Sequence, residues 1–126
     1  MEGFRLKRID ELASIHHGAV KLAGDELGVQ SFGLQVLDLP AGFTDYPEHD
    51  HSDDGQEEVY VVLEGSAEFE VAGERVLTDA GSMLWVSSGS KRRLEAGRYG
   101  VRILAIGCRQ GGSYQRPEGF RLAART

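Results

Sequence analysis

The stretch that decides the fold reads GFTDYPEHDHSDDGQEEVYVVLEG and covers residues 42–65. It holds His49 and His51, followed by Glu57 and Glu58 at the start of an apolar run that ends at a glycine. In an extended chain, residues i and i+2 lie on the same face, so we expect the two imidazoles to lie side by side. Two imidazoles and a carboxylate from the next strand suit a divalent transition metal. The residues therefore predict a metal site beside a β-strand.

Short apolar runs separated by turn signals continue on both sides of this stretch. Alternation of apolar and polar residues predicts half-buried strands, and the frequent glycines mark the turns between them. The expected strands cover residues 32–39, 57–64, 66–71, 75–78, 83–86, 92–95 and 100–106. Helical spacing predicts one short N-terminal helix over residues 8–15. This pattern is typical of an all-β sandwich or barrel.

Length and charge narrow the class of protein. The 126 residues fit one domain, which we divide into an N-terminal extension (1–30), a barrel (31–107) and a C-terminal tail (108–126). The formal net charge of −6 argues against a nucleic-acid partner. The sequence shows neither an apolar run of membrane-spanning length nor a signal-peptide core, and its single cysteine, Cys108, fits a reducing compartment. The simplest expectation is a cytoplasmic protein without membrane or nucleic-acid partners.

Over residues 32–106 the sequence resembles the cupin family, whose members are small β-barrels of jelly-roll type. The first cupin motif has the form G-x5-H-x-H-x(3,4)-E-x6-G. Here six residues separate Gly42 from His49, and six residues separate Glu58 from Gly65. The gap from His51 to Glu58 is also six residues, longer than the pattern. The resemblance implies that His49, His51 and Glu58 are the metal ligands.

Two neighbours of Glu58 remain alternative ligands. Glu57 shortens the gap from the second histidine by one residue but loses the spacing to the glycine, and Gln56 is the further candidate. A competing interpretation of the whole stretch is a solvated acidic loop, because carboxylates surround both histidines.

The second cupin motif, G-x5-P-x-G-x2-H-x3-N, is present in altered form. Gly81 is followed after five residues by Ser87-Ser88-Gly89, with serine in place of proline. Arg92 occupies the position of the metal-binding histidine, and Ala96 that of the asparagine. A guanidinium cannot bind a cation. Arg92 therefore either fills the metal position by pairing with a carboxylate, or stands beside a three-ligand site and binds an anionic substrate.

Several aromatic and apolar side chains are candidates for the lining of a ligand pocket. Tyr60 shares strand parity with Glu58, and Phe69, Met83 and Trp85 alternate on their own strands. Ordinary core packing is the competing interpretation for each of them. The histidine pair at residues 16–17 lies outside the resemblance and is expected to be incidental surface. Cys108 is expected to have no catalytic role.

These residues support two functions from different classes. The first is a small-molecule-binding cupin that holds Fe, Mn, Zn, Ni or Cu and carries out oxygenase or lyase chemistry on a small anionic substrate. The second is a metal-free binding or sensor protein in which Arg92 replaces the metal. A sugar or keto-acid isomerase is a lesser alternative that the resemblance allows. The resemblance also implies a homodimer, while the sequence leaves open whether any reaction is catalysed.

Overall fold

The computed structural model describes residues 3–112, 114–118 and 120–122. The remaining residues belong to the expected N-terminal extension and C-terminal tail, so those parts of the prediction lie partly outside the described residues. The elements are, in chain order, the 3₁₀-helix η1 (Ile9–Glu11), β1 (Ser14–Ile15), β2 (Val20–Lys21), α1 (Ala23–Leu27), β3 (Gly33–Leu39), β4 (Gln56–Val71), β5 (Glu74–Asp79), β6 (Met83–Val86) and β7 (Arg92–Arg109). No described helix is long and apolar enough to cross a membrane.

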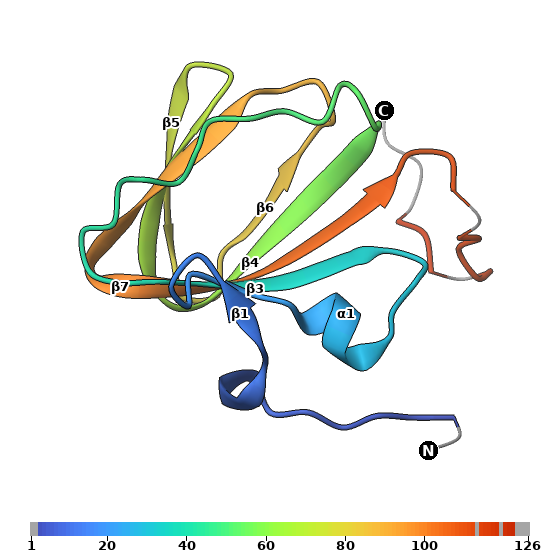
Figure 1. Ribbon diagram of the computed structural model, residues 1–126. Coiled ribbons are helices and arrows are strands. Elements are labelled where there is room, and N and C mark those ends of the chain that lie inside the picture. Colours follow the sequence, from blue (N-terminus) through green and yellow to red (C-terminus); the bar gives the residue numbers. More distant parts are fainter. Residues whose placement is uncertain (1–2, 113, 119, 123–126) are drawn as a thin grey trace.

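The strands form one antiparallel sheet in the order β1-β2-β3-β7-β4-β5, with β6 paired to β4. Figure 1 shows β4 and β7 crossing the molecule and bending sharply, so that the sheet curls around an interior. The two strands pair from Gln56↔Arg109 to Val71↔Arg92, with register shifts between Val62 and Glu64 and between Gly65 and Ala67. These irregularities lie where the paired strands bend, as bulges do at the corners of barrels.

The segment before β4 covers the side of the barrel next to the first half of β7. His49 donates its backbone N–H to the Arg92 carbonyl oxygen at 3.0 Å, and Arg92 returns the bond at 2.9 Å. Further along, the Ala96 N–H donates to the Phe43 carbonyl oxygen at 2.9 Å. This pairing fixes the histidine-bearing segment to β7, and Figure 1 shows its green coil running beside the orange strand.

The main core fills the barrel interior. Alternate residues of β4 point inward, and among them Tyr60 and Phe69 are fully buried with ring centroids 5.1 Å apart. Leu37 and Leu39 of β3 and Ile103 of β7 belong to the same cluster. A second, smaller cluster under α1 buries the opposite face of β3. The all-β barrel expected from the period-2 pattern is thereby confirmed.

The structure corrects two expectations about secondary structure. The helix predicted over 8–15 is only the single turn Ile9–Glu11, because the chain enters β1 at Ser14 and pairs with β2. The pairs of strands predicted at 57–64 and 66–71, and at 92–95 and 100–106, are each one long bent strand. Glycine at these points marks a bend within a strand: Gly65 and Gly100 have positive φ values of 76° and 81°.

The bend at Gly65 provides a test of this architecture. A Cβ at Gly65 would collide with the Gly100 carbonyl oxygen, whereas a Cβ at Gly73 meets nothing within 4 Å. Both glycines have positive φ, so alanine suffers backbone strain at both positions. We expect Gly65→Ala to lower the free energy of unfolding by at least about 2 kcal/mol more than Gly73→Ala does. Urea unfolding of the two variants measures the difference, and equal losses would contradict this role for Gly65.

Candidate metal centre

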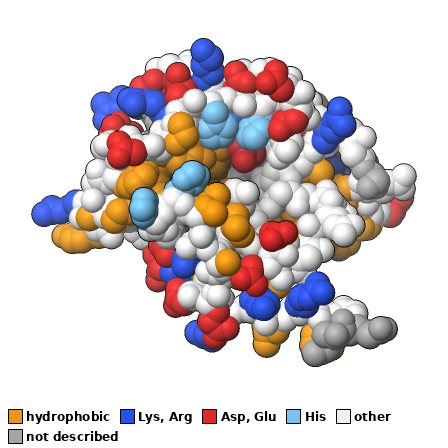
Figure 2. All heavy atoms as spheres, viewed as in Figure 1, with side chains coloured by type: hydrophobic (Ala, Val, Ile, Leu, Met, Phe, Trp, Pro, Cys, Tyr) orange, Lys and Arg blue, Asp and Glu red, His pale blue; other side chains and the backbone are white. Residues whose placement is uncertain are grey.

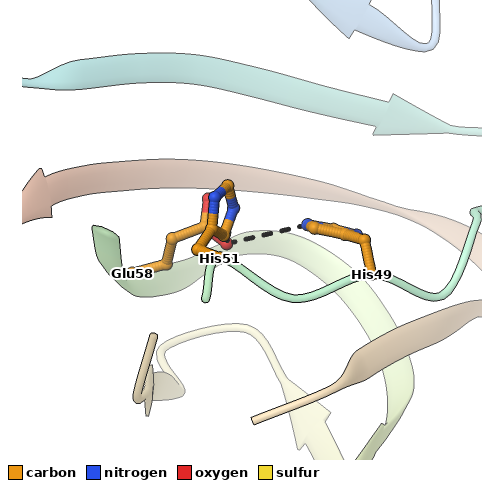
Figure 3. A group of neighbouring side chains, drawn as sticks. All are labelled: His49, His51 and Glu58. Atoms are coloured by element: carbon orange, nitrogen blue, oxygen red, sulfur yellow. Dashed lines mark ion pairs between the residues drawn. The ribbon is translucent and has the colours of Figure 1, made fainter. Parts of the chain in front are cut away.

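Three side chains converge inside the barrel at its open end. His49 and His51 come from the segment paired with β7, and Glu58 comes from the inward face of β4 (Figure 3). One ligand atom from each residue lies within 4.8 Å of the other two. The Nε2 atoms of His49 and His51 lie 3.9 and 3.3 Å from Glu58 Oε1. The imidazole rings meet nearly edge to face, with centroids 5.2 Å apart.

The other nitrogen of each imidazole faces an oxygen acceptor. His49 Nδ1 lies 3.1 Å from the Pro47 carbonyl oxygen, and His51 Nδ1 lies 3.2 Å from both carboxylate oxygens of Asp54. A carbonyl or carboxylate acceptor places the ring proton on Nδ1 and leaves a free lone pair on Nε2. Metal-binding histidines are oriented by outer partners of this kind. Asp54 had not been singled out from the sequence.

The donor set fits a divalent transition metal. His51 Nε2 is buried and has no hydrogen-bond partner among the described residues, although it lies close to Glu58. A buried lone pair without a partner is costly, and a metal ion would satisfy it. Two imidazoles and one carboxylate accept Fe, Mn, Zn, Ni or Cu. The triad His49, His51 and Glu58 can therefore hold a metal ion, whose identity the donor set leaves open.

Arg92 is buried inside the barrel next to Glu58. Its exposed fraction is 0%, its Nη2 donates to the Ser87 carbonyl oxygen at 2.9 Å, and its Nη1 lies 3.9 Å from Glu58 Oε1. Arg92 Nε and Nη1 have no hydrogen-bond partner in the described part of the chain. The next residue, Arg93, has the opposite parity and lies 3.8 Å from Glu70 on the outside. Arg92 is thus a buried counter-charge for Glu58.

The expected contact between Arg92 and an anionic ligand stays a prediction. Arg92 is not among the residues that line the two cavities beside the triad, and its Nη1 lies 3.9 Å from Glu58 Oε1. From the sequence alone, either Arg92 or Arg93 could face the interior; the structure places Arg92 there, next to Glu58.

The strand parity settles which residues near Glu58 face inward. Glu57 faces outward and accepts a hydrogen bond from Trp85 Nε1 at 2.7 Å. Gln56 shares the parity of Glu58, and its Nε2 donates to Asp54 at 3.3 Å. Glu57 therefore lies outside the barrel, and Gln56 lies beside the triad, where its amide contacts Asp54.

The predicted lining residues divide between the two faces of the sheet. Tyr60 and Phe69 are buried in the barrel, and the Tyr60 hydroxyl donates to Glu58 Oε1 at 2.6 Å. Trp85 and Met83 are 56% and 73% exposed on β6, so the expectation that they line the same pocket is wrong. Residues 83 and 85 have the parity opposite to the buried Val86, which places them on the outer face.

Two phenols beside the triad are held in their neutral form. Burial raises the pKa of Tyr46 to about 12, and the Glu58 carboxylate acts in the same direction. Burial likewise raises the pKa of Tyr60 far above its ordinary value, helped by Tyr46 and Glu58. Tyr60 therefore remains a hydrogen-bond donor to Glu58 at neutral pH. Tyr46, whose ring centroid lies 5.7 Å from that of His49, carried no sequence signal beyond its position before the histidines.

The fold can be compared with solved structures. A cupin protein from Bacteroides fragilis matches with a TM-score of 0.77 over 99% of this chain and 100% of its own, at 21% sequence identity. The chain has a cupin fold. A predicted oxalate decarboxylase from Thermotoga maritima matches with a TM-score of 0.62, 21% identity, and coverage of 82% of this chain and 98% of its own. KdgF from Halomonas sp. matches with a TM-score of 0.64 and 12% sequence identity, over 88% of this chain and 97% of its own.

Two comparisons of the sequence of this chain found no match. No protein-family model matches it, and no curated protein matches it. At identities this low, the likeness to solved cupins establishes the fold, and the chemistry has to be argued from the site.

Alkaline pH should destabilise the fold through Tyr46. The unfolded phenol ionises near its ordinary pKa of about 10, whereas the folded phenol stays neutral until about pH 12, so stability is present below pH 10 and is lost as the pH rises. We expect Tyr46→Phe to reduce the loss of unfolding free energy between pH 9 and pH 11 by about 1 kcal/mol. Urea unfolding at both pH values measures it; an unchanged loss in the variant would contradict this assignment.

Proposed function

We propose that this chain is a divalent-metal-dependent cupin that acts on a small anionic substrate. The observation that carries the proposal is the convergence of two histidine Nε2 atoms on Glu58 Oε1, with both Nδ1 atoms already facing acceptors. That arrangement leaves three free donor positions on one side of the barrel interior. His49, His51 and Glu58 would hold the ion.

The charges around the triad favour an anion. Glu58 and the fully buried Arg92 cancel formally, and they lie 3.9 Å apart. A divalent ion would therefore leave the site with a net positive charge in a partly buried environment, where electrostatic interactions are stronger than in water. The description of the Thermotoga maritima neighbour as a predicted oxalate decarboxylase supports an anionic substrate.

The chain's own residues would orient the ligands. Tyr60 donates to Glu58 and fixes one carboxylate oxygen, and Asp54 fixes the ring of His51. A divalent ion bound by two histidines and one carboxylate supplies Lewis-acid or oxygen chemistry, the basis for proposing lyase or oxygenase activity. The same arrangement keeps Tyr60 as a hydrogen-bond donor, since its phenol stays protonated.

Adjacent glutamates on opposite faces of β4 test the metal site. Glu58→Gln removes the inward ligand, whereas Glu57→Gln makes the same chemical change on the outer face. We expect the wild type and Glu57→Gln to contain about one transition metal per chain, and Glu58→Gln to bind Mn²⁺ at least about 100-fold more weakly. Elemental analysis of untagged protein and calorimetric titration measure both. Equal metal content in the two variants would overturn the proposal.

A second function is favoured by the position of Arg92. Its Nη1 lies as close to Glu58 Oε1 as His49 Nε2 does, at 3.9 Å. A guanidinium at this distance offsets the carboxylate charge and opposes the entry of a cation. The second candidate is therefore a metal-free ligand-binding cupin in which Arg92 takes the place of the ion.

Substitution by histidine at neighbouring positions separates the two functions. Arg92→His removes the buried positive charge and adds an imidazole beside the triad, while Arg93→His makes the same change on the outer face. We expect Arg92→His to bind Zn²⁺ at least about tenfold more tightly than Arg93→His, a difference of about 1.4 kcal/mol.

The metal content of the wild-type protein distinguishes the two functions. Metal in the purified wild type supports the first function, and no metal even after incubation with divalent ions supports the second. If Arg92→His and Arg93→His bind Zn²⁺ equally, Arg92 does not occupy a position from which it controls the metal.

A further inference from the structure

A large cavity opens beside the triad, between the β1–β2 hairpin and the segment that carries the histidines. Its volume is about 750 Å³. Most of its wall is apolar or aromatic, and includes Val20, Leu39, Phe43 and Tyr46. Figure 2 shows pale blue histidine side chains on both sides of a group of orange hydrophobic side chains on this face. A pocket with this lining binds ligands that have an apolar body.

The cavity is continuous with the candidate metal centre through His49, which lines both. On the other side of the triad lies a smaller cavity of about 240 Å³, lined by His51, Glu58 and the amide side chains of Gln35 and Gln56. The site therefore has an apolar side and a polar side, with the triad between them.

The smaller, polar cavity is open because position 107 is a glycine. A Cβ at Gly107 would lie 2.8 Å from Gln56 Oε1 and 3.4 Å from Glu58 Cγ. A side chain at position 107 would therefore displace the Gln56 amide and lie against Glu58. The absence of a side chain at position 107 keeps this end of the site open.

We infer that the substrate is a carboxylate bearing a ring or a branched hydrocarbon group, and that the 750 Å³ cavity receives this apolar part. The placement of the carboxylate at the triad rests on the proposed function, whereas the apolar cavity does not depend on a metal. A compact dianion such as oxalate would leave most of the wall uncovered. A sugar would place some of its hydroxyl groups against Val20, Leu39 and Phe43, which offer no side-chain hydrogen-bond partner. The polar side chains of the wall are those of Asp45, Tyr46 and three histidines.

The tip of the β1–β2 hairpin forms part of the wall of this cavity. His16 and His17 both have left-handed backbone conformations, with φ values of 55° and 57°, and both line the cavity. Left-handed conformations at successive residues are what a tight turn between antiparallel strands requires, and histidine adopts them more readily than most residues do. Because Ile15 and Val20 pair across the turn, the hairpin holds the two imidazoles at the rim opposite His49. Both residues are exposed, as expected for a surface pair.

Three probes test the inference by isothermal titration calorimetry on the metal-loaded full chain. The probes are 3-phenylpropanoate, acetate, which lacks the ring, and 3-phenylpropan-1-ol, which lacks the carboxylate. We expect 3-phenylpropanoate to bind at least about tenfold more tightly than either of the others. Equal affinity for acetate and 3-phenylpropanoate, or no binding of the two ring-bearing probes, would overturn the inference.

A matched pair of valine substitutions locates the ring. Val20→Phe fills part of the cavity, and Val61→Phe makes the same change on the outer face of β4 next to Met83. We expect Val20→Phe to lower the affinity for 3-phenylpropanoate at least about tenfold. The affinity for acetate and the metal content should stay unchanged. Val61→Phe should change none of the three. An undiminished affinity in Val20→Phe would place the ring elsewhere and overturn the inference.

Two further measurements distinguish the test of the cavity from the test of the metal site. Ring-bearing probes that bind a metal-free wild type with the same sensitivity to Val20→Phe would support the cavity and overturn the metal-dependent function. If Val20→Phe does not fold, amide chemical shifts of the wild-type protein replace it. 3-Phenylpropanoate should then shift Val20 and Leu39 more than Val61, and the reverse order would overturn the inference.

Discussion

The pairing of β4 with β7 is the constraint on which the rest of the structure depends. These two strands pair through both halves of the barrel, and each bends at a glycine instead of ending there. One strand carries Glu58 on its inward face, and the other holds the histidine segment by backbone hydrogen bonds. The metal centre is therefore assembled from two parts of the chain that the same pair of strands brings together. A register shift of one residue in β4 would turn Glu58 outward.

The second determining feature is the burial of the Arg92 guanidinium next to the Glu58 carboxylate. A fully buried guanidinium is costly unless its charge and its N–H groups are compensated. Arg92 receives partial compensation from Ser87 and from the nearby carboxylate of Glu58, while two of its nitrogens lack partners in the part of the chain that the structure describes. Together with the unpartnered Nε2 of His51, these are buried polar atoms that the ion or the anionic ligand of the proposed function would satisfy.

Much of the fold and the centre of the site could be predicted from the sequence. Strand alternation and the spacing of His49, His51 and Glu58 were sufficient, because both depend on local parity and on a motif. What the sequence could not give depends on pairing between distant segments. Trp85 and Met83 alternate as a lining strand would, but only the pairing of β6 with β4 shows which face they occupy.

The same limit applies to the N-terminal hairpin and to the bent strands. His16 and His17 reach the cavity only because β2 pairs with β3 at the edge of the sheet, which local pattern does not report. A glycine in a strand pattern is equally consistent with a turn and with a bend. The choice at Gly65 was decided by the partner strand, whose Gly100 carbonyl occupies the space beside it.

The mutual backbone hydrogen bonds of His49 and Arg92 have a consequence for how such a site can change over generations. Their N–H and carbonyl groups hold one another whatever side chains the two residues bear. The backbone structure at these two positions therefore does not depend on the chemistry of their side chains. A single codon change at position 92 could exchange a fixed cation for a metal ligand while the barrel stays as it is, so related barrels can gain or lose a metal without first acquiring a new fold.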